Sequence, residues 1–326
     1  MKDLSDAPLK SMNLNEISGD SGPYCMSFKF DLGPLIRSIQ KWGLLFPPFV
    51  VVNESGNMDV VIGFRRILAL KSLKWDKAPM KDLSEKKLSA LDLLLLNLYD
   101  NLAVRSFNDV EKGMILNRLR PHLSEKVLRE VYMPLLGVPP RDSIAPVYEK
   151  LENADSEIKV SLADGTLSFG TVKALLDADP ESRTVLFEWI KDFRFNLNQQ
   201  SFFIDITEDI SINEEKSISQ LLAEAPITKI RRNKTLNNPQ RSKRLLAYLR
   251  SRRYPRLAES EKAFERKIKT LGLPGNVKIS YPPSFEGPDY RLEILFTNGK
   301  RLGETIKVLS GMDGLVGIGD PWEERP

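Results

Sequence analysis

The chain has 326 residues, of which 41% are hydrophobic and 28% are charged, and its formal net charge is +4. A chain of this length and composition can bury a sizeable core and is long for a single domain. With one cysteine, Cys25, and one histidine, His122, it excludes an internal disulfide and a zinc site built from both residue types. No apolar run approaches the roughly twenty residues of a membrane span and the N-terminus lacks a signal-peptide core, so we expect a cytoplasmic protein without a membrane partner.

The first structured segment, residues 35–52, predicts a short helix followed by a strand. The helix ends at Gly43, a Leu-Leu-Phe-Pro turn that contains Pro47 comes next, and residues 49–52 form the apolar run Phe-Val-Val-Val. Upstream of this segment, we interpret Cys25 as a small packed residue rather than a nucleophile.

Residues 60–70 predict the end of a buried strand, a turn at Gly63, and an apolar helix whose first turn carries Arg65 and Arg66. This arrangement favours anion binding, because Gly63 lets the backbone approach a ligand and the free N–H groups at a helix start carry positive partial charge. Arginine adds planar, bidentate donors that suit phosphate. The alternative is an ordinary pair of surface arginines satisfied by neighbouring carboxylates.

Leucines at positions 88, 91, 95 and 98 predict a helix that ends near Asp100 and Asn101. Arg105 follows this helix. Its ordinary role would be an ion pair with Asp109, four residues later.

In this order and at these separations, the three segments resemble the nucleotide-binding domain of the ParB partition-protein family. The resemblance covers about residues 10–112 and continues more weakly to about residue 225. It implies a CTP-binding DNA clamp or a close relative that uses Mg²⁺. By motif position, the residues implied at the nucleotide are Gly43 and Pro47 beside the base and Gly63, Arg65, Arg66 and Arg105 at the phosphates. Asp100 and Asn101 are implied at the metal, and they are the catalytic candidates for hydrolysis.

The sequence departs from the family pattern at four places. Phe46 replaces a glutamine of the first segment, which weakens the case for cytosine selectivity, and Phe64 replaces a glutamate between Gly63 and the arginines. Asp100 replaces a glutamate that is longer by one methylene. The usual arginine of the third segment falls on Val104, with Arg105 one place late. Nucleotide binding is therefore better supported than hydrolysis, and a CTPase activity stays open.

Two relatives of the same superfamily can be compared at the phosphate segment. Sulfiredoxins need a cysteine and a histidine there, where this chain has Phe64 and Arg65, so that function is excluded. ParB-like serine kinases carry a histidine in this segment, although a carboxylate base elsewhere could replace it. A small-molecule kinase that uses the same pocket is therefore the alternative function.

Residues 107–228 read as helical and resemble the helix-turn-helix region of ParB proteins. Asn108 and Glu111 have the spacing of a capping box, so we assign Glu111 to helix capping rather than catalysis. The candidate recognition helix, residues 141–152, carries Pro146 and offers few of the Arg, Lys, Asn or Gln side chains that read bases in the major groove. Helical packing without base reading is an equal alternative.

The charge of the chain is concentrated near its C-terminal third. Residues 229–326 hold 21 Lys and Arg against 11 Asp and Glu, and no acidic residue lies between 229 and 256. Because such density is self-repelling unless a polyanion neutralises it, we expect residues 229–258 to contact DNA phosphates. A solvated basic helix is the plainer alternative. The DNA-binding candidates are Arg231, Arg232, Lys234, Arg241, Lys243, Arg244, Arg250, Arg252 and Arg253.

The fold class we expect is α+β. A ParB/sulfiredoxin-like α/β domain over residues 1–106 precedes the helical domain over 107–228 and the basic segment over 229–258. Residues 259–312 predict a small basic module of helix, strand, strand and helix, and residues 313–326 a flexible tail. The resemblance implies a nucleoid-associated homodimer whose partners are DNA and a nucleotide.

Overall fold

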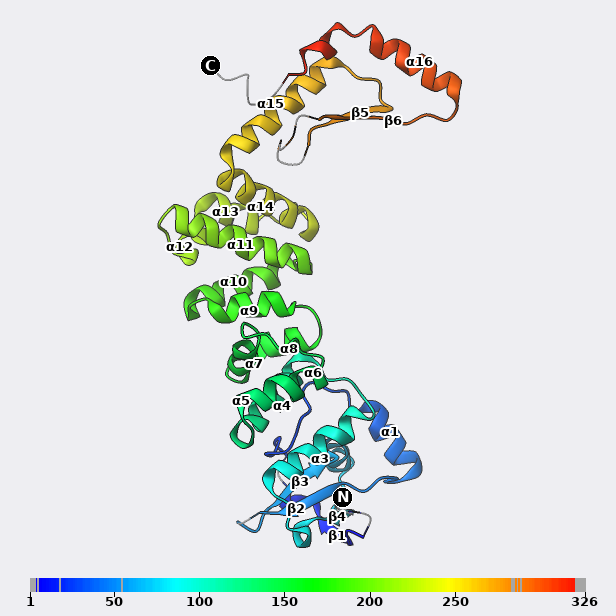
Figure 1. Cartoon of the computed structure of the whole chain (residues 1–326), viewed down its shortest axis with the longest axis vertical. Helices are drawn as coiled ribbons and strands as arrows, with labels where there is room; N and C mark the ends of the chain where they lie inside the picture. The colour runs from blue at the N-terminus through cyan, green and yellow to red at the C-terminus, as the bar shows by residue number, and fades with distance from the viewer. Residues whose placement is uncertain are drawn as a thin grey trace. The chain divides into compact units, whose positions relative to one another are not determined.

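The structure is a computed structural model that describes residues 4, 6–17, 19–53, 55–282, 285, 287 and 289–319. The chain divides into two compact units, residues 1–187 and 188–326. Helices predominate, with a four-stranded sheet in the first unit and a two-stranded sheet in the second (Figure 1). The mixed α/β class expected from the sequence is therefore observed. Within the described parts of the chain, no helix is long and apolar enough to cross a membrane.

The sheet of the first unit has the strand order β1-β4-β2-β3. Its strands are β1 (Leu9–Asn13), β2 (Phe49–Val52), β3 (Met58–Ile62) and β4 (Lys77–Asp82). Strands β2 and β3 pair antiparallel, and β2 pairs parallel with β4. Asn53 closes the β2–β3 turn, because its side-chain oxygen accepts from the N–H groups of Ser55 and Asn57 at 3.1 and 3.0 Å. After this turn, β3 runs to Ile62 and leads directly into Gly63.

Helices α1 (Gly33–Trp42), α2 (Phe64–Ser72) and α3 (Ala90–Leu102) lie with this sheet, as the three sequence segments predict (Figure 1). Helix α1 packs against α2, and α3 packs against β3. The core of this part includes Val50, Ile67, Leu70 and Met80, each fully buried, together with Cys25. Cys25 is thus a packed residue, and burial raises the pKa of its thiol. His122, by contrast, lies on the surface.

Helices continue through the rest of the first unit and across the boundary between the units. They are α4 (Asp109–Leu119), α5 (Glu125–Val127), a π-helical turn (Leu128–Tyr132), α6 (Met133–Leu135), α7 (Ala145–Glu152), α8 (Ser156–Ala163), α9 (Phe169–Asp177) and α10 (Pro180–Phe193). The capping box at Asn108 and Glu111 is confirmed, with both reciprocal bonds present. The candidate recognition helix begins at Ala145 rather than at 141, and it buries Val147 and Leu151.

The second unit begins with helices that pack around an aromatic core. The helices are α11 (Leu197–Asn213), α12 (Ile218–Ala223), α13 (Ala225–Arg231) and α14 (Asn238–Arg253). Trp189, Phe193, Phe195 and Phe203 stack in this core with ring centroids 5.1 to 6.4 Å apart. Aromatic rings bury large apolar areas, so this cluster stabilises the packing of α10 and α11, and α11 in turn packs against α14.

The C-terminal module has the order helix, strand, strand and helix. Its elements are α15 (Pro255–Leu271), β5 (Val277–Ser280), β6 (Arg291–Ile294) and α16 (Gly299–Ser310). Strands β5 and β6 pair antiparallel. Of the expected tail, residues 313–317 form a 3-10 helix and residues 320–326 lie outside the described residues.

Candidate anion-binding site

The turn from β3 into α2 has a geometry that strongly favours glycine. Gly63 has φ 93° and ψ 25°, in the left-handed region, and it is the residue that precedes α2. A Cβ at this position would lie 3.1 Å from Arg66 Nη1 and 3.2 Å from Pro48 Cβ. The first turn of α2 has no side-chain cap, and the N–H groups of Arg66 and Ile67 already bond Gly63 O at 2.8 and 3.2 Å. Within the described part of the chain, the N–H groups of Phe64 and Arg65 are therefore the ones left to a ligand.

A cavity of about 200 Å³ opens at this turn. Its wall comes from four parts of the chain: the start of α2, the end of α3 with the residues after it, the segment at Cys25 to Ser27, and Leu35 of α1. Of the residues expected at a nucleotide, it is lined by Gly63, Arg65, Arg66, Asp100, Asn101 and Arg105. Residues from two separate sequence motifs therefore meet in one place.

Arg65 is half-buried and incompletely bonded. Its Nη2 lies 3.5 Å from Glu111 Oε1, and its guanidinium carbon lies 4.8 Å from the centroid of the Phe30 ring. Its Nε atom is buried and has no hydrogen-bond partner among the described residues. Burial lowers the pKa of Arg65 from its ordinary value, and the nearby charge of Arg105 lowers it further. An unsatisfied buried donor is costly, so this side chain is suited to receive an anion.

Arg66 has a different environment. Its guanidinium lies 5.9 Å from the centroid of the exposed Phe46 ring, and no ion pair joins it to a described carboxylate. The alternative of a pair of surface arginines satisfied by carboxylates therefore does not describe Arg66. Its charge is available to a bound anion.

Arg105 is already satisfied within the protein. Its Nε donates to Asn101 Oδ1 at 2.8 Å, its Nη1 donates to Glu111 Oε2 at 2.7 Å, and its Nη2 donates to Met26 O at 2.9 Å. The expected pairing with Asp109 is wrong, because Asp109 instead bonds Tyr148 and Lys112, on the other side of the start of α4. Arg105 thus shapes the cavity wall and has few donors left for a phosphate.

The two candidate metal ligands differ in availability. Asp100 is exposed at the cavity, and the described residues give it no hydrogen bond or ion pair. Asn101 has its oxygen bonded to Arg105 and its amide nitrogen bonded to Asn97 O at 2.9 Å. A group of three or more His, Cys, Asp or Glu side chains that could hold a metal is absent from the described residues. The donor set fits a cation bound through one carboxylate, phosphates and water, as Mg²⁺ often is, rather than an all-protein cage.

The departures from the family pattern also have defined places. Phe64 is buried in the core, and Val104 is exposed at the cavity rim while the next residue, Arg105, points inward. Gly43 ends α1 with φ 74°, and neither it nor Pro47 lines the cavity. The two residues that the resemblance implies beside the nucleobase therefore lie outside this cavity.

Sequence reasoning missed three contributors to the site. Glu111 was assigned to capping alone, although it also contacts both Arg65 and Arg105. Asn97, which is buried and donates to Val61 O, holds Asn101, and Phe30 stacks on Arg65. The capping box was a signal for the position of Glu111. No local pattern indicated contacts between residues 111 and 65.

More of the positive charges in the basic segment, residues 229–258, are paired with carboxylates of the same chain than the local sequence suggests. Five of its nine DNA-binding candidates form ion pairs with acidic residues outside the segment. Arg252 bonds both Glu214 and Glu224, and Arg250 bonds Glu261 through two bonds of 2.9 Å. The remaining pairs are Arg231 and Arg241 with Asp192, and Arg253 with Asp209. The premise that only an external polyanion could neutralise these charges is therefore wrong, since the fold supplies carboxylates from α10, α11 and neighbouring elements.

The other four candidates are exposed, and no ion pair joins them to the described part of the chain. They are Arg232, Lys234, Lys243 and Arg244. Arg244 also lines a surface hollow of about 270 Å³ between α13 and α14, together with Lys229 and Tyr248. These cations are free to meet phosphates.

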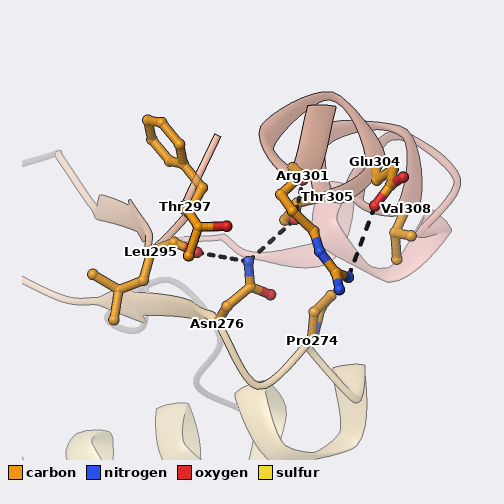
Figure 2. Close-up of a pocket in the computed structure, with 9 residues that line it drawn as sticks. Pro274, Asn276, Leu295, Thr297, Arg301, Glu304, Thr305 and Val308 are labelled. Carbon is orange, nitrogen blue, oxygen red and sulfur yellow. Dashed lines mark hydrogen bonds and ion pairs between the residues drawn. The ribbon is translucent and has the colours of Figure 1, made fainter. Parts of the chain in front are cut away.

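A hollow of about 640 Å³ lies in the C-terminal module, between β6 and α16 (Figure 2). Asn276 points into it and donates to Leu295 O at 2.9 Å and to Thr305 Oγ1 at 3.1 Å. Arg301 faces Glu304 at 3.9 Å. Its polar groups thus largely bond one another, and this hollow has neither the free donors nor the charge excess of the first cavity.

Comparison with known proteins finds likeness at the level of structure alone. No protein-family model matches the chain, and no curated protein matches it. A solved structure of the C-terminally truncated chromosome-partitioning protein ParB from Caulobacter crescentus, complexed with CTP-γ-S, is 21% identical over 52% of this chain and 93% of its own, with a TM-score of 0.27. The same protein complexed to the centromeric parS site is 16% identical over 59% of this chain and 96% of its own, with a TM-score of 0.32.

Proposed function

We propose that the chain binds a nucleoside triphosphate with Mg²⁺ at this cavity and uses that binding to change its grip on DNA, as a ParB-like partition or regulatory protein. The observation that carries the proposal is the meeting of Gly63, Arg65 and Arg66 with Asp100 around one cavity. These residues come from separate segments that the family resemblance had already grouped by function.

The charge balance at the cavity supports a polyanionic ligand. Arg65, Arg66 and Arg105 stand against the buried carboxylate of Glu111 and the exposed carboxylate of Asp100, so the described wall keeps a positive excess. Arg65 has a buried Nε without an acceptor, and the start of α2 adds backbone donors. The described cavity of about 200 Å³ is small for a drug-sized ligand, and it suits the phosphates better than a whole nucleotide.

The residues that would contact Mg²⁺ and the nucleobase form less complete sites than those at the phosphates. Asp100 would hold Mg²⁺ together with the phosphates, and the ion would neutralise phosphate charge. Asn101 would reach the ion only if its oxygen left Arg105. Gly43 and Pro47 would shape the base side outside the cavity, and the preference for CTP rests on the family resemblance. Asp100 and Asn101 remain the residues proposed to act in any hydrolysis.

The DNA contacts are proposed for the exposed cations of the second unit. Arg232, Lys234, Lys243 and Arg244 have no carboxylate partner among the described residues, whereas the five paired arginines hold helices together. Helix α7 contributes little to base reading, because Val147, Tyr148 and Leu151 are buried and its exposed residues include Glu149 and Glu152. We therefore assign phosphate contact chiefly to α13, α14 and the turn between them.

A homodimer is proposed through the C-terminal module. A two-stranded sheet alone is marginal in stability, and Leu292, Leu295 and Phe296 on or after β6 are more than half exposed. Ile306 and Val308 on α16 are exposed to a similar degree. A second copy of the chain would cover these residues. Analytical ultracentrifugation of the full chain measures whether it is a dimer.

The function is tested by measuring DNA affinity with and without nucleotide. Fluorescence anisotropy of a labelled duplex is followed at fixed salt, first with the protein alone and then with each nucleoside triphosphate and Mg²⁺. The proposal predicts that one triphosphate changes the affinity or the lifetime of the complex. DNA binding that no nucleotide alters, together with phosphate transfer to a small hydroxyl compound, would instead establish the kinase alternative.

A further inference from the structure

Glu111 is the most completely buried charged side chain at the cavity, with 1% of its surface exposed. It lies in the first turn of α4, and its carboxylate bonds groups from four places in the chain. Oε1 accepts from the N–H of Phe28 at 3.0 Å and lies 3.5 Å from Arg65 Nη2. Oε2 accepts from Arg105 Nη1 at 2.7 Å and from the N–H of Asn108 at 3.1 Å.

Helix capping accounts for only one of these contacts. Of the Glu111 carboxylate, a capping box requires only the bond with the N–H of Asn108, while the reciprocal bond joins the Glu111 N–H to the Asn108 side chain. The contacts with Phe28, Arg105 and Arg65 are additional, and they place a negative charge beside the cavity in which an anion is expected. A buried carboxylate needs such partners, since an unpaired one would be strongly unfavourable.

The two arginines on this carboxylate are held with different strength. Arg105 has bonds at all three nitrogens, and those at Nε and Nη2 go to Asn101 and Met26, so two of its anchors do not depend on Glu111. Arg65 approaches Glu111 only to 3.5 Å, and its Nε has no partner. Of the two arginines, Arg65 is therefore the one that an incoming anion can draw away.

We propose that Glu111 is an internal counter-ion that restrains Arg65 in the empty cavity and that the phosphates of the ligand displace. This inference rests on the proposed nucleotide function and adds a positioning residue to it. In the free protein Glu111 balances the charge of Arg65. In the complex a phosphate oxygen takes that place, and Arg65 gains an acceptor at both Nη2 and Nε.

A double-mutant cycle tests the role of Glu111 by calorimetry with the triphosphate that the wild type binds. Glu111→Gln removes the competing charge, so the affinity should rise about three- to tenfold. In the Arg65→Ala background the same substitution should change the affinity by less than about twofold, because no restrained arginine is left to release. Far-UV circular dichroism and thermal unfolding show whether each variant is folded.

The outcomes separate the possible failures. If Glu111→Gln raised the nucleotide affinity equally in both backgrounds, Glu111 would act only by electrostatic repulsion of the ligand. If it lowered the affinity equally in both, Glu111 would have a purely structural role. Either result overturns the counter-ion role. Failure of the wild type to bind any nucleoside triphosphate would instead overturn the proposed function itself.

A second measurement uses the wild type and does not depend on the folding of Glu111→Gln. The Nε–H resonance of Arg65 is assigned by its loss in Arg65→Lys and is followed during nucleotide titration. Displacement predicts a saturable shift at the same concentration as the calorimetric transition, since Nε acquires an acceptor. Nucleotide binding without any shift of this resonance contradicts the proposal.

Discussion

Among single residues, Arg65 and Arg66 are the side chains on which the proposed anion binding most depends. Arg105 lies beside them, yet each of its nitrogens is already bonded within the protein. Arg65 retains an unpartnered Nε, and Arg66 has no carboxylate in reach among the described residues. Three arginines that look alike in sequence therefore divide into one that builds the wall and two that can bind.

The substitutions Arg65→Ala and Arg66→Ala should each lower nucleotide affinity by roughly 1.5 to 3 kcal/mol, because each removes charge-assisted hydrogen bonds to phosphate. Isothermal titration calorimetry measures the change. Arg129→Ala is the matched control, since Arg129 pairs with Asp142 away from the cavity and its loss should leave binding unchanged. Unaltered binding in both single variants and in the double variant would rule out the phosphate site.

Gly63→Ala should destabilise the first unit and weaken nucleotide binding. The new Cβ would lie 3.3 Å from the backbone Cα of Pro48, and the residue would keep φ 93°. We expect a cost of about 1 to 3 kcal/mol in the free energy of unfolding, measured with urea. Gly56→Ala is the control, because Gly56 has φ 80° but no atom within 4 Å of the added Cβ. Equal losses in the two variants would show that the contact with Pro48 has no importance.

For helices and strands, the sequence predicted many of the elements but not β1 and β4, which are half of the four-stranded sheet. The helix ending at Gly43, the strand before Gly63 and the capping box at Asn108 follow from local signals that the chain carries within a few residues. The cavity residues could be grouped because they belong to motifs with a known family order. The partners of Arg105 and Arg65 could not be predicted, since Glu111 reaches them only once the chain has folded and α4 has packed beside α3.

The same reason explains the correction to the basic segment. A charge run was judged from the residues beside it in sequence, whereas its neutralising carboxylates come from elsewhere. Glu214 follows α11 and Glu224 follows α12, and both bond Arg252 on α14. Ion pairs between helices leave no local sequence signal, so only the fold could divide the arginines into paired and exposed sets.

The Arg252 network predicts a pH dependence of stability. Hydrogen bonds from Arg252 hold the pKa of Glu214 and of Glu224 at about 2, below their ordinary value of 4.5. Because the folded pKa is depressed, the stabilisation is fully present above about pH 4.5 and is lost as the pH falls toward 2. Arg252→Ala should therefore cost about 2 kcal/mol near pH 6 and much less near pH 2.5.

Urea unfolding of the wild type and of Arg252→Ala across this pH range measures the difference. Lys243→Ala on the same helix is the control, since Lys243 is exposed and has no ion pair with a described residue. A stability gap that stays constant from pH 6 to pH 2.5 would show that the network does not depend on ionised carboxylates.

For the whole molecule, the proposed nucleotide site lies in the first unit and the proposed DNA contacts lie in the second. Salt dependence identifies the DNA residues, since log affinity falls with log salt by about 0.9 for each duplex phosphate neutralised. Replacing the exposed set with alanine should flatten this slope and leave nucleotide binding intact. The set is Arg232, Lys234, Lys243 and Arg244.

The paired arginines serve as the comparison for that experiment. Arg231→Ala and Arg250→Ala should change stability more than the salt slope, because their charges are already balanced by Asp192 and Glu261. If the paired set flattened the slope and the exposed set did not, the assignment of DNA contacts would be reversed.

The most direct test of the central claim is calorimetry of the full chain with CTP, ATP, GTP and UTP, each with and without Mg²⁺. The account predicts that at least one triphosphate, with CTP the first candidate, binds one per chain and more tightly with Mg²⁺, and that Asp100→Asn removes the gain from the metal. Absence of binding for all four triphosphates in the presence of Mg²⁺ would contradict the account.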